Sequence, residues 1–95
     1  MPKLNIHNKA GIKLEIKAGP KKGSNFDGTP KVLDVENNKS VCYDYSDECL
    51  VTAEPKMKNT GIKAANYVGK RGAKTKDIYV TGEDDRLTIS DEEPD

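Results

Sequence analysis

The sequence predicts a small, mostly β domain, either an antiparallel barrel or a sandwich, built from three hairpins plus an extra strand. Apolar residues recur at every second position through much of the chain, which is the period of a strand with one buried face. The alternating segments are short and are separated by Gly, Pro, Asn and Asp, which favour turns. Because the chain has 95 residues, we assign one domain to residues 1–90 and a flexible acidic tail to 91–95.

The first predicted hairpin covers residues 4–16. Its two apolar pairs would meet on one face: Leu4 with Ile16 and Ile6 with Leu14. Gly11 would take the left-handed position of a three-residue loop. Residues 18–30 contain three glycines and two prolines, and they predict a long loop with little regular structure.

A second hairpin is predicted over residues 33–45, with Asn38 left-handed in a loop at 36–38. Residues 49–54 would form a further strand. If that strand pairs with the second arm of the hairpin, Cys42 and Cys49 would lie opposite each other, close enough for a disulfide. We expect reduced thiols, because a cytoplasmic location is the default for this chain.

Residues 61–68 fit two structures. They could form a short helix, or a strand with Ile62, Ala64 and Val68 facing inward; eight residues are too few for periodicity to decide. A third hairpin follows, with a four-residue loop at 82–85. Its arms would place two apolar residues opposite two others: Ile78 and Val80 opposite Leu87 and Ile89.

The charges are segregated along the chain although the formal net charge is zero. The segments 1–31 and 32–55 carry net charges of +5 and −5, and the segments 56–76 and 77–95 carry +7 and −7. Alternation with core residues accounts for much of the first charge and for part of the second. The excess is concentrated in the basic residues at 56–76, especially 70–76, and in the acidic residues at 83–85 and 91–95, where we expect the functional residues to lie.

We therefore expect a non-enzymatic binding protein that docks on a protein partner through segregated basic and acidic surfaces, as an inhibitor, adaptor or assembly component. Self-association of opposite charges is a variant of this function. The small size and lack of motifs would suit a viral or mobile-element accessory protein. The expected partner-binding residues are Lys70, Arg71, Lys74, Lys76, Glu83, Asp84 and Asp85.

The alternative is a small-barrel nucleic-acid-binding protein that contacts the phosphate backbone mainly through residues 56–76. Tyr67 would stack on a base. The residues expected to carry this function are Lys21, Lys22, Lys56, Lys58, Lys63, Tyr67, Lys70, Arg71 and Lys74.

Catalysis, a cofactor and a bound metal are not expected. His7 is the only histidine, and a histidine that acts as a general base needs a positioned partner. Ser40 and Cys42 are available, but no local signature connects them to His7. No stretch approaches the ~20 apolar residues of a membrane span.

Overall fold

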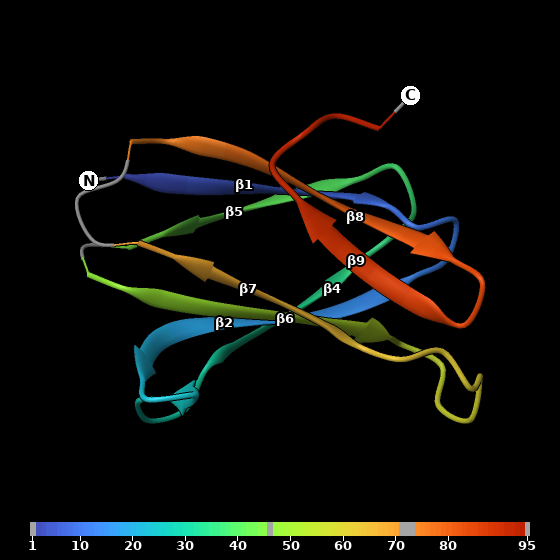
Figure 1. Cartoon of the computed structure of the whole chain (residues 1–95), viewed down its shortest axis with the longest axis horizontal. Coiled ribbons are helices and arrows are strands. Elements are labelled where there is room, and N and C mark those ends of the chain that lie inside the picture. Colours follow the sequence, from blue (N-terminus) through green and yellow to red (C-terminus); the bar gives the residue numbers. More distant parts are fainter. Residues whose placement is uncertain (1, 46, 71–73, 95) are drawn as a thin grey trace.

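The computed structural model describes residues 2–45, 47–70 and 74–94, and none of these forms a helix. Nine strands are present in this part of the chain (Figure 1). They are β1 (Lys3–Lys9), β2 (Leu14–Lys22), β3 (Asn25–Phe26), β4 (Lys31–Val35), β5 (Ser40–Asp44), β6 (Cys49–Pro55), β7 (Ala65–Gly69), β8 (Lys76–Glu83) and β9 (Arg86–Ser90). A helix long and apolar enough to cross a membrane is absent from the described ranges.

The strands form two sheets, which confirms the mostly β, sandwich-like architecture. One sheet has the order β5-β1-β8-β9, and β1 pairs with β8 in parallel. The other has the order β3-β2-β6-β7, with β4 also paired to β2. Figure 1 shows β1, β5 and β8 in the upper part of the molecule and β2, β6 and β7 in the lower part. The apolar faces of the two sheets enclose the core between them.

The predicted pairing of the first hairpin is wrong, although its inward faces are right. β1 pairs with β5 and β8, whereas β2 pairs with β4 and β6, so the two segments belong to opposite sheets. The chain crosses between the sheets after Asn8, a fully buried polar residue. Its amide donates to the carbonyls of Ile12 at 2.8 Å and Val35 at 2.9 Å, and this holds the crossover in place. Gly11 has φ +84°, as the loop prediction required.

The second predicted hairpin is also divided between the sheets, because β4 pairs with β2 while β5 pairs with β1. Asn38 is left-handed as expected, with φ 64°. The strands that carry Cys42 and Cys49 do not pair with each other. Both thiols are free; Cys42 is exposed and Cys49 is buried.

Residues 18–30 contain more regular structure than predicted. β2 continues to Lys22, and a tight turn at Gly23, with φ +64°, leads into β3. Near the end of β2, Pro20 pairs with Cys49 of β6. This extension brings the last residues of β2 to the end of the sandwich where the candidate site lies.

The ambiguous segment 61–68 contains a strand, β7, but with the opposite face inward from the one predicted. Ala65 is buried and Tyr67 is half-buried, whereas Ala64 and Val68 are exposed. Ile62 precedes the strand and packs against the core.

The third hairpin is present, because β8 pairs with β9, but its register differs by two residues from the predicted one: Val80 pairs with Ile89, and Gly82 pairs with Leu87. Its strands extend further than predicted, to the pair Glu83–Arg86, so the turn is shorter and Asp84 has φ 55°.

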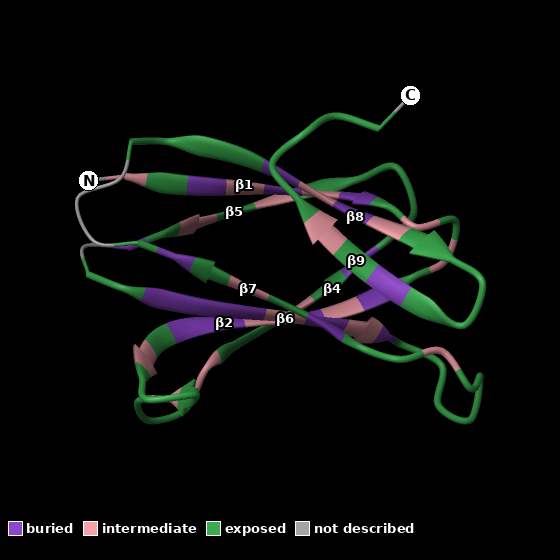
Figure 2. Cartoon of the chain, in the orientation of Figure 1, coloured by how far each residue is buried: buried purple, intermediate pink, exposed green. Residues whose placement is uncertain are grey.

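The core lies between the sheets, where buried positions alternate along the facing strands (Figure 2). It comprises Leu4, Ile6, Leu14, Ile16, Ala18, Val35, Tyr45, Cys49, Val51, Ala53, Ala65, Ile78, Val80 and Leu87. Most of these residues are small or medium aliphatics, so Tyr45 stands out as a large amphipathic side chain at one end of the core.

Candidate functional site

The structure separates the predicted basic and acidic partner-binding residues. Lys76 begins β8 and Glu83 ends it, which places them about 23 Å apart at the ~3.3 Å rise of a strand. Lys70 and Lys74 lie in the connection before β8, at the same end of the strand as Lys76. Asp84 and Asp85 lie in the turn after β8, at the same end as Glu83. Arg71 is outside the described residues. The two groups therefore do not form one surface on a single copy.

The predicted nucleic-acid residues are also divided. Lys56 lies 3.1 Å from Asp34, and Lys58 lies 3.3 Å from Glu15 and 3.2 Å from Glu54. These pairs neutralise both lysines on the outer face of the five-stranded sheet. Lys63 lies further along the segment between β6 and β7 that contains Lys56 and Lys58. Its backbone forms hydrogen bonds with the β8–β9 hairpin.

The remaining basic residues gather at the opposite end of the sandwich. Pro20 of β2, Cys49 of β6 and Gly69 of β7 pair in one row across the five-stranded sheet. The next residues at these three neighbouring strand ends are Lys21, Glu48 and Lys70. Lys21 forms an ion pair with Glu48 at 3.1 Å. Strands two apart lie about 10 Å from each other, so Lys21 and Lys70 flank Glu48 on this end. Lys22 is the next residue along β2 and is exposed.

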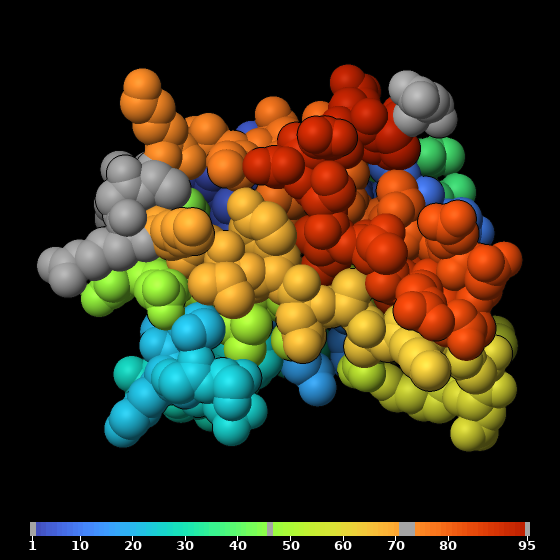
Figure 3. Space-filling model, in the orientation of Figure 1, coloured from blue at the N-terminus to red at the C-terminus, as the bar shows by residue number. Residues whose placement is uncertain are grey.

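A groove opens at this end where the edges of the two sheets part. At the other end of the sandwich, two backbone hydrogen bonds join these edges. The N–H of Lys63 donates to the carbonyl of Asp85 at 2.7 Å, and the N–H of Leu87 donates to the carbonyl of Lys63 at 2.9 Å. β7 and β9 remain neighbours beyond this point but form no ladder within the described ranges. Figure 3 shows β7 and the C-terminal segment side by side on one face of the molecule.

We call this cavity of about 300 Å³ the tyrosine groove. Its lining residues come from four separate parts of the chain: Tyr45, Tyr67, Val68, Gly69, Lys70, Lys76 and Asp91. The lining combines two aromatic rings, one exposed valine and a glycine backbone with two lysines and one carboxylate. Aromatic side chains surrounded by polar residues are typical of the energetically important part of a protein interface.

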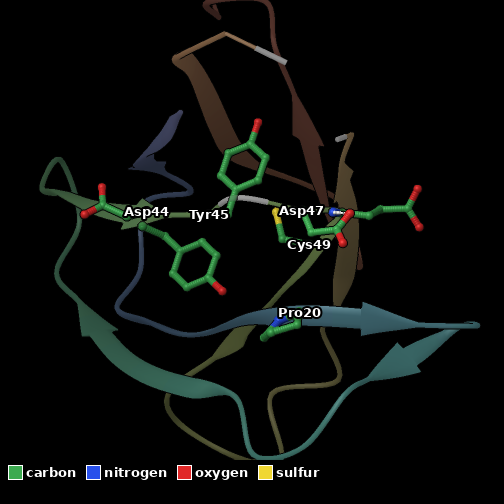
Figure 4. A pocket seen from close by; sticks show the side chains of 7 residues that line it. Pro20, Asp44, Tyr45, Asp47 and Cys49 are labelled. Atoms are coloured by element: carbon green, nitrogen blue, oxygen red, sulfur yellow. Dashed lines mark hydrogen bonds between the residues drawn. The ribbon is translucent and has the colours of Figure 1, made fainter. Parts of the chain in front are cut away.

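Tyr45 divides the groove from a second, smaller cavity. Its ring stacks with that of Tyr43, with ring centroids 6.5 Å apart and planes 3° apart. The second cavity, of about 140 Å³, is lined by Pro20, Tyr43, Asp44, Tyr45, Asp47, Glu48 and Cys49. Figure 4 shows Tyr45 between the labelled Asp44 and Asp47, with Pro20 on β2 below Cys49. Burial raises the pKa of Tyr45, so its hydroxyl remains a neutral hydrogen-bonding group.

The charge of the tyrosine groove is basic at its rim. Lys76 has one described partner, Asp91 at 3.4 Å, and both side chains are about half-exposed. Lys70 and Lys74 are exposed and form no ion pair with a described residue. Asp91 is the first residue of the acidic tail, so the tail begins with a carboxylate that pairs with a lysine of the groove.

Tyr67, Lys70 and Lys76 were among the predicted binding residues, and Asp91 belongs to the acidic segment 91–95 where function was expected. Tyr45 and Val68 were not predicted to be site residues. The odd-numbered alternation of residues 41–45 already placed Tyr45 inward. The missing information was that Tyr45, which follows β5, lies beside Gly69 of β7, and this proximity depends on pairings between segments far apart in the chain. Comparison with protein-family models, curated proteins and solved structures finds no match to this chain.

Proposed function

We propose that the chain is a protein-binding module that holds an acidic segment of a partner protein in the tyrosine groove, and that the groove binds this segment without catalysing a reaction. The observation that carries this proposal is the convergence of Tyr45 and Tyr67 with Lys70 and Lys76 in one cavity. The tyrosines offer large, stiff contact surfaces, and the lysines attract carboxylates and orient the approach. This proposal keeps the basic half of the expected partner surface and leaves the acidic turn at 83–85 outside it.

The ion pair between Lys76 and Asp91 supports an acidic occupant. Both side chains are solvent-exposed, and such pairs contribute only about 0–1 kcal/mol. A partner carboxylate can therefore replace Asp91 at small cost. Val68, 38% exposed beside Lys70, adds an apolar contact at the same place.

The test is a selection of short random peptides displayed on phage against the immobilised protein. We expect the selected peptides to be rich in Asp and Glu and to contain an apolar or aromatic residue. The variant Lys70→Glu/Lys76→Glu should weaken their binding by about tenfold or more, because each change replaces an attraction with a repulsion. The matched control Lys31→Glu/Lys39→Glu makes the same charge change at exposed lysines elsewhere and should have a much smaller effect. Selected peptides that bind both variants equally would contradict the proposal.

Nucleic-acid binding receives less support, because Lys56 and Lys58 are neutralised by carboxylates and lie far from Lys21, Lys22 and Lys70. β6 separates the two groups by about 20 Å. Fluorescence anisotropy with labelled single- and double-stranded DNA and RNA at low and moderate salt tests this alternative. We expect no binding of these nucleic acids at micromolar protein concentrations. Tight binding that weakens steeply as the salt concentration rises would favour the alternative instead.

A further inference from the structure

His7 lies between a serine and an aspartate on the outer face of the four-stranded sheet. Its Nδ1 is 2.6 Å from Oγ of Ser40, and its Nε2 is 2.9 Å from Oδ1 of Asp77. If Nε2 carries the proton and donates it to Asp77, then Nδ1 accepts a hydrogen bond from the Ser40 hydroxyl. This is the order of groups that makes a serine nucleophilic: hydroxyl, imidazole base and carboxylate.

The pairing of three strands brings these residues together. Ser40 of β5 is the register partner of His7 of β1. On the other side of β1, Tyr79 of β8 is the partner of His7, and its ring stacks on the imidazole with centroids 4.8 Å apart and planes 17° apart. Asp77 precedes Tyr79 by two residues on the same face. The imidazole is therefore fixed by one stacking contact and two hydrogen bonds.

The carboxylate of Asp77 is suited to holding the imidazole. Hydrogen bonds from His7 and then from Asn5 lower the pKa of Asp77 below its ordinary value, so it stays ionised. An ionised carboxylate fixes the tautomer of the ring and stabilises the imidazolium that forms when the ring takes a proton.

Lys9 supplies a cation beside this chain of groups. It is two residues after His7 on the same face of β1, so their Cα atoms are about 7 Å apart. It is exposed and forms no ion pair with a described residue. If Oγ of Ser40 attacked a carbonyl group, negative charge would develop on the carbonyl oxygen. This charge would lie within the electric field of the Lys9 ammonium group.

We propose that Ser40 is an activated nucleophile for carboxylic esters, with His7 as its general base and Asp77 as the residue that positions His7. Oγ of Ser40 bonds to the ester carbonyl carbon while its proton passes to Nδ1 of His7. The bond to the leaving alkoxide then breaks, and the alkoxide takes the proton from His7. Water hydrolyses the acyl-serine to the carboxylic acid and restores the hydroxyl. This activity is separate from the proposed binding in the tyrosine groove and does not rest on it. Because this face of the sheet is open to water, we expect esters to acylate Ser40 slowly, and we do not expect rapid turnover of the ester.

The test is labelling of the full chain with a tagged alkyl fluorophosphonate, located by peptide mass mapping. Its phosphorus is attacked as the ester carbon would be: the bond from Oγ to phosphorus forms, fluoride leaves, and the serine proton goes to His7 and then to water. Ser90 is an internal control, because it is exposed on the same face and pairs with Tyr79. We expect Ser40 to be labelled at least about tenfold faster than Ser90, at the low end of what a positioned base contributes.

Four variants separate the roles. Ser40→Ala should remove the label, and His7→Gln should reduce labelling of Ser40 to the rate of Ser90. Asp77→Asn should slow labelling and Asp77→Glu should restore part of it, which a merely structural role would not produce. These side chains are at the surface, so each variant should keep the thermal midpoint of the parent within a few degrees. Labelling of Ser40 no faster than Ser90, or unchanged in His7→Gln, would overturn the proposal.

Discussion

A Cβ atom on Gly69 would lie 2.5 Å from Sγ of Cys49. The two residues are register partners across β6 and β7, and the buried thiol occupies the space that a side chain at position 69 would need. The backbone of Gly69 consequently forms part of the tyrosine groove. The packing of β7 on β6 and the shape of the groove thus depend on the same pair.

Gly69→Ala should therefore destabilise the protein by about 1–3 kcal/mol, the usual cost of an overpacked core. Urea denaturation measures this loss. In the Cys49→Ala background the same substitution should cost clearly less, because the sulfur that it meets is gone. Equal costs in both backgrounds would show that Cys49 is not the obstacle.

Asn8→Leu should destabilise the protein by about 2–4 kcal/mol. The substitution removes the donor to two carbonyls, those of Ile12 and Val35, and leaves them without a partner where the chain crosses between the sheets. Asn66→Ala, on an exposed position of β7, is the control and should change the free energy of unfolding by less than about 0.5 kcal/mol. A loss no larger than that of the control would mean that the crossover does not depend on Asn8.

Stability should fall in acid partly through Glu15. Hydrogen bonds with Glu54 and Lys58 hold the pKa of Glu15 below its ordinary value. A carboxyl with a lowered folded-state pKa stabilises the protein above its unfolded-state value, about 4.3, and this contribution disappears as the pH falls through the folded-state value. Glu15→Gln and Lys58→Met should each flatten the dependence of the urea midpoint on pH below about 4.5. Variants whose curves parallel that of the parent would contradict this role.

The two thiols should react very differently in the native protein. Cys42 is exposed, whereas Cys49 has no exposed surface, and burial raises its pKa, which lowers its thiolate fraction. A maleimide dye should label one thiol rapidly in the native state and two in urea. No labelling without reductant would indicate a disulfide, and rapid labelling of two thiols would indicate that the end of the sandwich near Cys49 opens readily.

Alternation along the sequence predicted which side chains face the core because that information is local. Leu4, Ile6, Leu14 and Ile16 are all buried as predicted. Their pairing could not be predicted, because the same inward face fits a hairpin arm and a strand in the opposite sheet. The choice depends on Asn8, whose carbonyl partner Val35 is 27 residues away.

The site was less predictable than the fold for the same reason. Lys70 and Lys76 were predicted as binding residues because of their charge. Their neighbours in the groove, Tyr45 and Asp91, come from distant segments of the chain. Local sequence also gave no sign that Lys56 and Lys58 would be neutralised, since Glu15 lies on a strand more than 40 residues earlier.

The most direct test of the tyrosine groove is an amide chemical-shift titration of the ¹⁵N-labelled chain with an acidic peptide from the phage selection. Binding in the groove predicts that the largest shifts fall on Tyr67, Val68, Gly69, Lys70, Lys76 and Asp91. It also predicts that Lys70→Glu/Lys76→Glu abolishes them. Largest shifts on the outer sheet face around Glu15 and Lys58, or at the turn of Asp84, would show that acidic segments do not bind in the groove.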